Sequence, residues 1–293
     1  MFGFLDIWKP PGLSSFDMIR QIRRCVGRGE KIGYAGTLDP LAEGILVLCL
    51  GQATRLTDLI HSYPKRYTSL ARLGATSTTD DAEGQISRID VTSPPSLKRV
   101  EQILRQFTGV IEQVPPAFSA VKIAGRRAYE IARSGKTPDL AVKKVVIHSL
   151  EIIEYEYPRL RLRVNCGSGT YIRSLVRDIG GKLGVSGYCE EIIRESVGPF
   201  DADRAVGPEQ INADNIERFL ISPVEAVPLE ARITITDEQA CELVHGRAID
   251  LSGRPDSREK LLGAVNQNCD LIGLIRHDQT TGQFRPEKIF ILP

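Results

Sequence analysis

The sequence predicts an α+β fold, with a mixed, largely antiparallel sheet flanked by helices and loops, and a small β-rich domain at the C-terminal end. Three observations lead to this class. Strand-like and helix-like apolar periodicities both occur along the chain. Neighbouring strand-like stretches follow one another as in hairpins, without the regular alternation of βαβ units. The stretch 222–232 contains two prolines and is followed by about 60 residues with one short helix and several short strands.

In the first 50 residues we predict two strands and a helix, with one glycine-rich loop before the second strand. Residues 1–8 read as a strand closed by a turn at 9–12, and Ser14 and Ser15 precede a capped helix with apolar Phe16, Ile19, Ile22 and Val26. The outer face of this helix carries four arginines: Arg20, Arg23, Arg24 and Arg28. A glycine-rich loop at 33–44 then enters a continuous apolar strand, Ile45–Leu50. Loops at the end of a buried strand commonly carry reactive side chains.

The rest of the chain is assigned by the same periodicities. We expect helices at 53–61, 97–107 and 237–244, strands at 66–73, 142–150, 152–155 and 160–164, and a Thr/Asp-rich loop at 76–84. Thr170 is the expected N-cap of a further helix whose apolar face runs from Ile172 to Leu183. The expected domains are a core at 1–228 and an appended domain at 229–293.

Composition excludes some classes of protein and leaves others open. The 293 residues are 42% hydrophobic and 26% charged, which is typical of a folded globular chain. The six cysteines form no C-x-x-C pair, and the N-terminus lacks the pattern of a signal peptide. We therefore expect a cytoplasmic protein that does not enter a membrane. The net charge of +1 neither favours nor excludes a nucleic-acid partner.

Asp39 is the first candidate for chemistry. It lies in the stretch GTLDP, and Asp before Pro is more often only a turn residue. Its setting favours a reactive role, because glycines at 33, 36 and 44 allow close backbone approach and Pro40 restricts the backbone of Asp39.

Two other segments suit an RNA ligand. The turn Gly167–Arg173 contains two glycines and free N–H groups for a phosphate, although an ordinary flexible turn is the commoner case. Lys65-Arg66-Tyr67 places an aromatic ring beside two cations, which suits base stacking, although a surface tyrosine on a strand is commoner.

A local excess of positive charge distinguishes residues 120–144. This stretch holds seven cations and two acids, whereas the whole chain is nearly neutral. Such a concentration favours contact with an anionic partner over a solvated face. The four histidines form no dyad or metal motif, and no nucleotide-binding loop is present, so we expect carboxylate chemistry without a metal or cofactor.

Six sequence blocks, in order, resemble the TruB family of pseudouridine synthases. They are DIWKPPGLSS, GTLDPLAEGILVLCLGQATR, KRYTSLARLG, PPAFSAVKIAGRRAYEIAR, GTYIRSLVRDIG and RESVGPF. The resemblance covers nearly the whole chain, most securely residues 4–200. It implies a pseudouridine synthase core and a small PUA-like domain at the C-terminal end.

The resemblance also implies roles for particular residues. Asp39 would be the catalytic aspartate, Tyr67 would pack on the target base and assist proton removal from C5, and Arg173 would pair with the carboxylate. Tyr171 would line the same pocket, and Lys9 would support the region from the N-terminal Lys-Pro motif. The remaining expected RNA contacts are Tyr34, Lys122, Arg126, Arg127 and Arg194, with residues 115–144 as an RNA-gripping insertion.

The reaction implied is isomerisation of the T-loop uridine of tRNA, position 55, by a monomer that needs no obligate protein partner. Three positions depart from the family pattern: Tyr34 replaces a histidine, Thr78 replaces an aspartate, and Gly187-Tyr188-Cys189 replaces an Ala-His pair. All three are expected to affect RNA handling. They motivate an alternative, a non-catalytic tRNA-binding or tRNA-folding protein; a synthase working within a guide-RNA complex is a third, less favoured reading.

Overall fold

A nine-stranded sheet forms the centre of the structure, a computed structural model that describes residues 1–251 and 261–290. Its main strand order is β1-β3-β12-β4-β11-β10-β7, with β2 beside β3 and β13 beside β12. Only β12 and β3 pair in parallel, so the sheet is mixed and largely antiparallel, as predicted. The bounds are β1 Gly3–Lys9, β2 Ile32–Ala35, β3 Glu43–Leu50, β4 Lys65–Leu73, β7 Gly109–Gln113, β10 Lys143–Glu156, β11 Arg159–Cys166, β12 Gly187–Val197 and β13 Phe200–Asp201.

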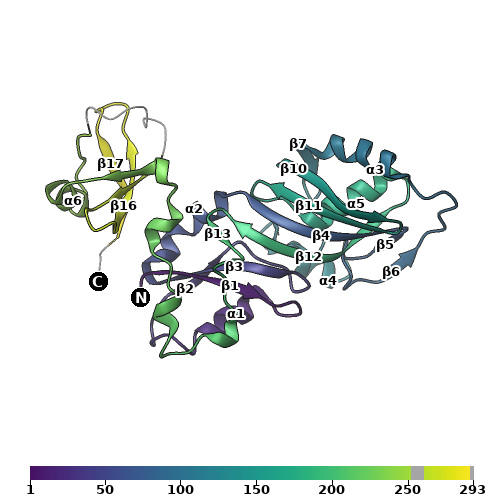
Figure 1. Ribbon diagram of the computed structural model, residues 1–293, viewed down its shortest axis with the longest axis horizontal. Coiled ribbons are helices and arrows are strands. Elements are labelled where there is room, and N and C mark those ends of the chain that lie inside the picture. The colour runs from purple at the N-terminus through teal and green to yellow at the C-terminus, as the bar shows by residue number, and fades with distance from the viewer. Residues whose placement is uncertain (252–260, 291–293) are drawn as a thin grey trace.

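The other strands of the described residues form three smaller sheets. A four-stranded sheet at the C-terminal end has the order β14-β15-β16-β17, and Figure 1 shows it beside the N-terminal strands, far from α3 and α5. This confirms the predicted α+β class with a β-rich C-terminal domain. The remaining bounds are β14 Arg232–Thr234, β15 Leu261–Val265, β16 Leu271–His277, β17 Phe284–Ile289, β5 Ala75–Ser77, β6 Ile86–Arg88, β8 Lys122–Ile123 and β9 Arg126–Arg127.

The helices are short, and three of the six in the described residues begin with a side-chain cap, at Ser14, Ser96 and Thr236. They are α1 Ser15–Ile22, α2 Thr57–Ser62, α3 Leu97–Leu104, α4 Ala128–Arg133, α5 Ile172–Leu183 and α6 Asp237–Val244. Ser14 caps α1 through a reciprocal capping box with Asp17, as expected. The expected cap of α5 is wrong: Tyr171 occupies the N-cap position, because the Thr170 hydroxyl donates to the Gly167 carbonyl at 3.0 Å.

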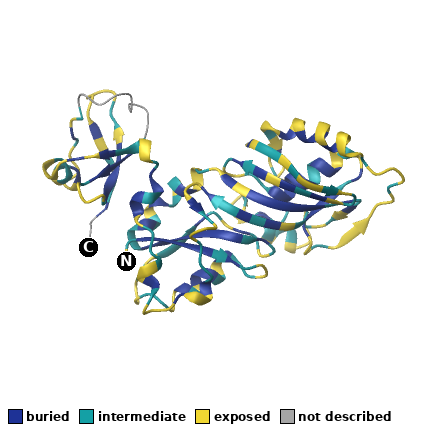
Figure 2. Ribbon diagram, in the orientation of Figure 1, coloured by how far each residue is buried: buried dark blue, intermediate teal, exposed yellow. Residues whose placement is uncertain are grey.

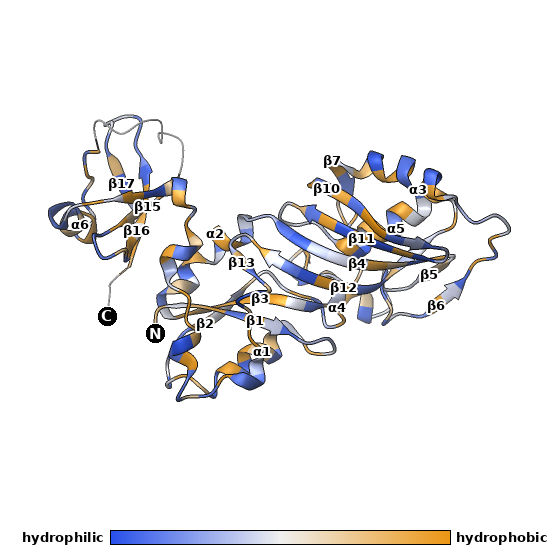
Figure 3. Cartoon of the chain, viewed as in Figure 1, coloured by the Kyte–Doolittle hydropathy of each residue, from blue (hydrophilic) through white to orange (hydrophobic). Residues whose placement is uncertain are grey.

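The main apolar core lies between the sheet and two helices. Helices α3 and α5 pack on each other and on the same sheet, and their outward residues are exposed while the central strands are buried (Figure 2). The strands carry hydrophilic as well as hydrophobic residues (Figure 3), because the other face of the sheet is polar. There, arginines pair with glutamates across strands: Arg66–Glu195, Arg72–Glu190, Arg161–Glu191 and Arg163–Glu151.

Several strand predictions need correction. The two strands expected at 142–150 and 152–155 are one strand, β10, whose bulges interrupt its alternation. Strands β2 and β5 lie within segments expected to be loops. The central strand β12 was not predicted, because its glutamates and Arg194 resemble a solvent-exposed segment. Cross-strand ion pairs, together with burial of Arg194, accommodate this charge.

The stretch 222–232, which its two prolines mark in the sequence, is packed and partly helical. It contains the 3-10 helices Pro223–Ala226 and Leu229–Ala231. Val224 and Val227 share an apolar cluster with Phe4 from the large sheet and with Leu271 and Phe290 from the C-terminal segment. The domain boundary at 228/229 stays a prediction, and the core continues across it.

Candidate active site

Three buried groups anchor the loop that joins β2 to β3 and carries Asp39. The first is Lys9, whose ammonium donates to the carbonyls of Pro10, Leu13 and Pro40 at 2.8, 2.7 and 3.3 Å. Burial lowers the pKa of Lys9 to about 8, and Asp39 partly opposes this shift. Because the side chain is 0% exposed, Lys9 supports the loop and offers no surface to RNA in this structure.

Arg194 is the second anchor. Its guanidinium donates to the carbonyls of Ile45 at 2.7 Å, Gly36 at 3.0 Å and Thr37 at 3.4 Å. The side chain is 2% exposed and holds the loop, and it also lines a cavity that Asp39 shares. Gly44 allows this arrangement, since a Cβ there would lie 2.2 Å from the Arg194 carbonyl oxygen. The expected contact of Arg194 with RNA stays a prediction.

The third anchor comes from α1. The Ser15 hydroxyl donates to the Leu38 carbonyl at 2.9 Å and accepts from the Leu38 amide at 2.8 Å. Ser15 thus holds both the amide and the carbonyl of Leu38, the residue before Asp39. The Asp39 side chain itself remains 36% exposed. The loop is rigidly held and presents its carboxylate outward.

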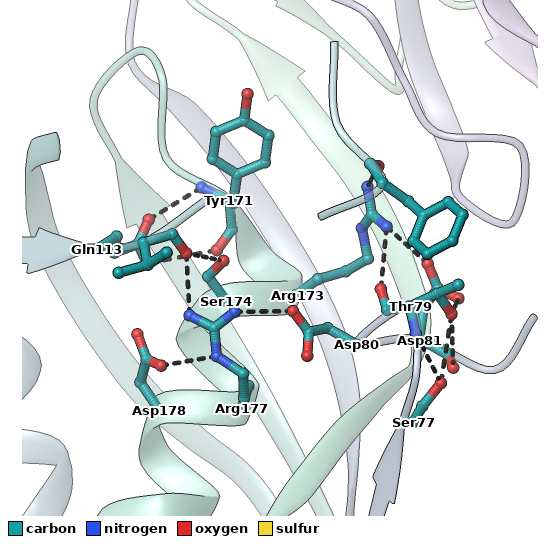
Figure 4. Close-up of polar contacts among 12 residues, drawn as sticks. Ser77, Thr79, Asp80, Asp81, Gln113, Tyr171, Arg173, Ser174, Arg177 and Asp178 are labelled. Atoms are coloured by element: carbon teal, nitrogen blue, oxygen red, sulfur yellow. Dashed lines mark hydrogen bonds and ion pairs between the residues drawn. The ribbon is translucent and has the colours of Figure 1, made fainter. Parts of the chain in front are cut away.

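Arg173 is the partner of that carboxylate. One guanidinium nitrogen lies 2.8 Å from Asp39 and donates to the Phe118 carbonyl. The other lies 2.8 Å from Asp81 and donates to the Thr79 carbonyl (Figure 4). Desolvation acts to lower the pKa of Arg173, and the two carboxylates more than offset it, so the pKa is raised. The predicted Asp39–Arg173 pair is therefore present, from the first turn of α5.

A second arginine holds the segment that carries Asp81. Arg177, one helical turn along α5, donates to Asp80 at 2.8 Å, Asp178 at 2.9 Å and the Val114 carbonyl at 2.9 Å (Figure 4). The Thr79 hydroxyl and the Glu83 amide donate to Asp81. Asp81 itself is 2% exposed, so it positions Arg173 from the interior.

A cavity of about 280 Å³ opens on one side of Asp39. Tyr67, Tyr171 and His61 line it, together with the turn 167–170 that the sequence marked for a phosphate. Burial raises the pKa of Tyr67, so its phenol stays protonated at neutral pH. Burial, and then the charge of Asp39, raises the pKa of Tyr171. The structure thus brings Tyr67, Tyr171 and Arg173 around Asp39.

A second cavity of about 640 Å³ lies on the other side of Asp39. Tyr34 and Phe16 line one part of it, and Arg127, Tyr129 and Arg133 from the predicted insertion line another. Lys122 and Arg126 are exposed on the β8–β9 hairpin and line neither of these two cavities. Of the insertion residues named from the sequence, Arg127 therefore lies nearest the carboxylate.

The three sequence departures differ in accessibility. Tyr188 and Cys189 are buried in β12, where the Cys189 thiol lies 3.1 Å from the Ser69 hydroxyl. Their expected role in RNA handling is wrong, because neither side chain is accessible. Thr78 accepts a hydrogen bond from the Gln85 amide and closes the turn between β5 and β6. Tyr34 alone faces a cavity shared with Asp39.

Comparison with known sequences shows the family. The family model described as "TruB family pseudouridylate synthase (N terminal domain)" matches residues 23–172. A tRNA pseudouridine synthase B of Dehalococcoides mccartyi is 35% identical over 299 residues, covering 100% of this chain and 98% of the relative. The chain belongs to the TruB family. Another protein of the same name, from Leifsonia xyli subsp. xyli, is 39% identical, covering 93% of this chain and 92% of the relative.

Solved structures have a fold similar to that of this TruB-family chain. The "Crystal Structure of a Cbf5-Nop10-Gar1 Complex" aligns with a TM-score of 0.72 and 22% identity, covering 100% of this chain and 84% of that one. The "Structure of H/ACA RNP bound to a substrate RNA containing 2'-deoxyuridine" gives the same TM-score and identity, covering 99% and 86%. The pseudouridine synthase fold is thereby confirmed.

The sequence patterns did not indicate two residues that lie in the site. Asp81 lay in the Thr/Asp-rich loop, where a run of polar residues gave no sign that one would be buried. His61 accepts from the Gly36 amide at 3.1 Å and lines the smaller cavity. Burial, and then the charge of Lys65, lowers the pKa of His61. No motif in the sequence singled this histidine out.

Within residues 1–251 and 261–290, no group of three or more His, Cys, Asp or Glu side chains is arranged to hold a metal ion. Over the same ranges, no helix combines the length and apolar character needed to cross a membrane.

Proposed function

We propose that this protein isomerises a uridine of tRNA to pseudouridine, and that the target is the T-loop uridine at position 55. Membership of the TruB family and relatives named tRNA pseudouridine synthase B support the reaction. The observation that carries it is the Asp39 carboxylate, held 2.8 Å from Arg173 and exposed to two cavities. Asp39 is the proposed catalytic residue.

The chemistry uses groups that the site already provides. The ionised Asp39 carboxylate forms a bond to the target nucleotide, and the glycosidic bond between the sugar and N1 of uracil breaks. The uracil turns within the cavity, its C5 bonds to the sugar carbon, the bond to Asp39 breaks and frees the carboxylate, and the C5 proton is transferred to N1, so atoms and charge balance without an external reagent. Tyr67 packs on the base as a neutral phenol and assists removal of the C5 proton.

The substrate must expose its base before reaction. Extruding a stacked base costs a few kcal/mol, which phosphate contacts and stacking offset. The excess of cations at 120–144, with Arg127 and Arg133 at the larger cavity, supports tRNA as the partner. We place the protein in the cytoplasm, acting as a monomer without a protein partner.

Incubation of purified protein with an unmodified tRNA transcript, followed by pseudouridine mapping, tests the proposal. We expect modification at the T-loop uridine, lost in Asp39→Asn and retained in Asp214→Asn. Asp214 is a matched control because it is exposed on a distant surface loop. Tight tRNA binding without any pseudouridine would favour the non-catalytic binding protein. Modification only at another position would overturn the T-loop assignment.

A further inference from the structure

The segment from α1 to β2 carries exposed cations that the proposed reaction does not use. Phe16 and Arg20 are exposed and lie four residues apart, so they are on the same side of α1. The helix ends at Ile22, and the turns that follow it expose Arg23, Arg24, Arg28 and Lys31. We call Arg20, Arg23, Arg24, Arg28 and Lys31 the α1 basic face.

The charge of this face is only partly neutralised by the protein. The stretch 16–31 contains five cations and two acids, Asp17 and Glu30. Asp17 forms an ion pair with Arg20 and accepts a hydrogen bond from the Ser14 amide. Glu30 forms an ion pair with the N-terminal amine. Among the described residues, none forms an ion pair with Arg24, Arg28 or Lys31.

Four arginines on the polar face of the large sheet show a different pattern. Arg66, Arg72, Arg161 and Arg163 each pair with a glutamate. A solvated protein surface typically mixes both signs in this way. The α1 basic face departs from that pattern, which indicates an anionic partner.

Its position identifies where that partner lies. The first residues of α1, Ser15 and Phe16, line the larger cavity together with Asp39. Arg127 and Arg133 line the same cavity from α4 and the hairpin before it. A polymer that enters this cavity therefore meets the start of α1, which the α1 basic face follows along the chain, and Arg127 and Arg133 of the insertion.

We propose that the α1 basic face binds consecutive phosphates of the T-arm strand whose base enters the Asp39 cavity, with Phe16 against the neighbouring base. This rests on the proposed function, because it takes tRNA as the substrate. An RNA strand fits better than an acidic protein, since the exposed aromatic ring of Phe16, which can stack on a base, lines the same cavity as Asp39. The face would act in substrate binding and leave the chemical step unchanged.

The test compares two double substitutions with equal loss of charge. Arg24→Gln/Arg28→Gln removes two unpaired, exposed cations that line neither cavity at Asp39. The matched control, Lys98→Gln/Arg99→Gln, removes two exposed cations from α3. Binding of an unmodified T stem-loop hairpin is measured by fluorescence anisotropy from about 50 to about 300 mM KCl, a range over which phosphate contacts weaken markedly.

For Arg24→Gln/Arg28→Gln we expect Kd to rise about fivefold or more at the lowest salt, and the slope of log Kd against log salt to fall by about one to two, since each phosphate contact contributes about 0.7–0.9. The control should remain within about twofold of wild type, and the single-turnover rate at saturating hairpin should be unchanged in both, as expected for phosphate contacts that act in binding alone.

Two outcomes would overturn the inference: unchanged binding in Arg24→Gln/Arg28→Gln, or an equal loss in the α3 control, which would indicate whole-molecule charge. The binding readout does not depend on chemistry. A wild-type protein that binds the hairpin without forming pseudouridine contradicts the proposed function only. A wild-type protein that isomerises uridine while the variant binds normally contradicts this inference only.

Discussion

Asp39 and Asp81 share one cation: Arg173 lies 2.8 Å from each of their carboxylates. The two acids differ in accessibility, because Asp39 is 36% exposed and Asp81 is 2% exposed. The inner carboxylate holds the guanidinium in place, and the guanidinium in turn orients the outer carboxylate toward the cavities. This division explains how a reactive aspartate can be both fixed and accessible.

Arg173→Lys should abolish most activity while preserving the positive charge. A lysine ammonium is a point charge and cannot reach both carboxylates and two carbonyls with the planar geometry of arginine. We expect the single-turnover rate to fall at least about 100-fold, equivalent to about 2.7 kcal/mol of activation free energy. Rapid-quench assays with saturating tRNA measure it, and tRNA affinity should change little. A rate within threefold of wild type would contradict the paired role.

Asp81→Asn should slow the reaction although the Asp81 side chain is only 2% exposed. The amide keeps the shape and removes the buried negative charge that positions Arg173. We expect a rate loss of about 10- to 100-fold, and a loss of about 1–3 kcal/mol in the free energy of unfolding. Urea unfolding and single-turnover rates are measured together. Loss of stability with a normal rate would assign Asp81 a structural role alone. Asp58→Asn, at an exposed acid, serves as the control.

Gly44→Ala should destabilise the fold near the catalytic loop. Gly44 has a φ of +105°, and an added Cβ would lie 2.2 Å from the Arg194 carbonyl oxygen. The clash forces apart the parallel pairing of β3 and β12, which also seats the Arg194 guanidinium. We expect a loss of about 3 kcal/mol or more, as for other strained substitutions. Gly12→Ala also has a positive φ but meets no atom, so it isolates the backbone strain in thermal unfolding. Equal losses in both variants would exclude the clash.

Asp6 should make the stability of the protein depend on pH. Its carboxylate oxygens are buried without hydrogen-bond partners, and burial, followed by the charge of Asp201, raises its pKa to about 7. Arg204 and Arg194 oppose the shift. Because the folded state binds this proton more tightly than the unfolded state, the free energy of unfolding falls as pH rises from about 4 to about 7.

Asp6→Asn removes this contribution. We compare the free energy of unfolding of the variant with that of wild type. The difference, variant minus wild type, should become more positive between pH 4 and pH 8, by at most about 4 kcal/mol from the size of the pKa shift. Urea unfolding at the two pH values measures the difference, with Asp214→Asn as a control. A difference that does not vary with pH would show that Asp6 titrates normally in the folded protein.

The sequence predicted correctly those helices and strands that depend on neighbouring residues. The cap at Ser14, the apolar strand at 45–50 and the amphipathic helix at 172–183 were expected and are present, because each depends on neighbouring residues. Strand β12 escaped prediction because its charges are compensated only by partners from β4 and β11. Its central place in the sheet is decided by pairing across long sequence separations.

The sequence by itself determined the α+β class, the loop that carries Asp39 and, through six ordered blocks, the family and the expected partners Tyr67 and Arg173. Only the tertiary structure decided which charged residues are interior. It placed Lys9 and Arg194 beneath the loop as anchors and Asp81 behind Arg173, and it left Arg24 and Arg28 exposed. The physical reason is that the burial of a charge depends on partners brought together from distant segments, and no local pattern records those partners.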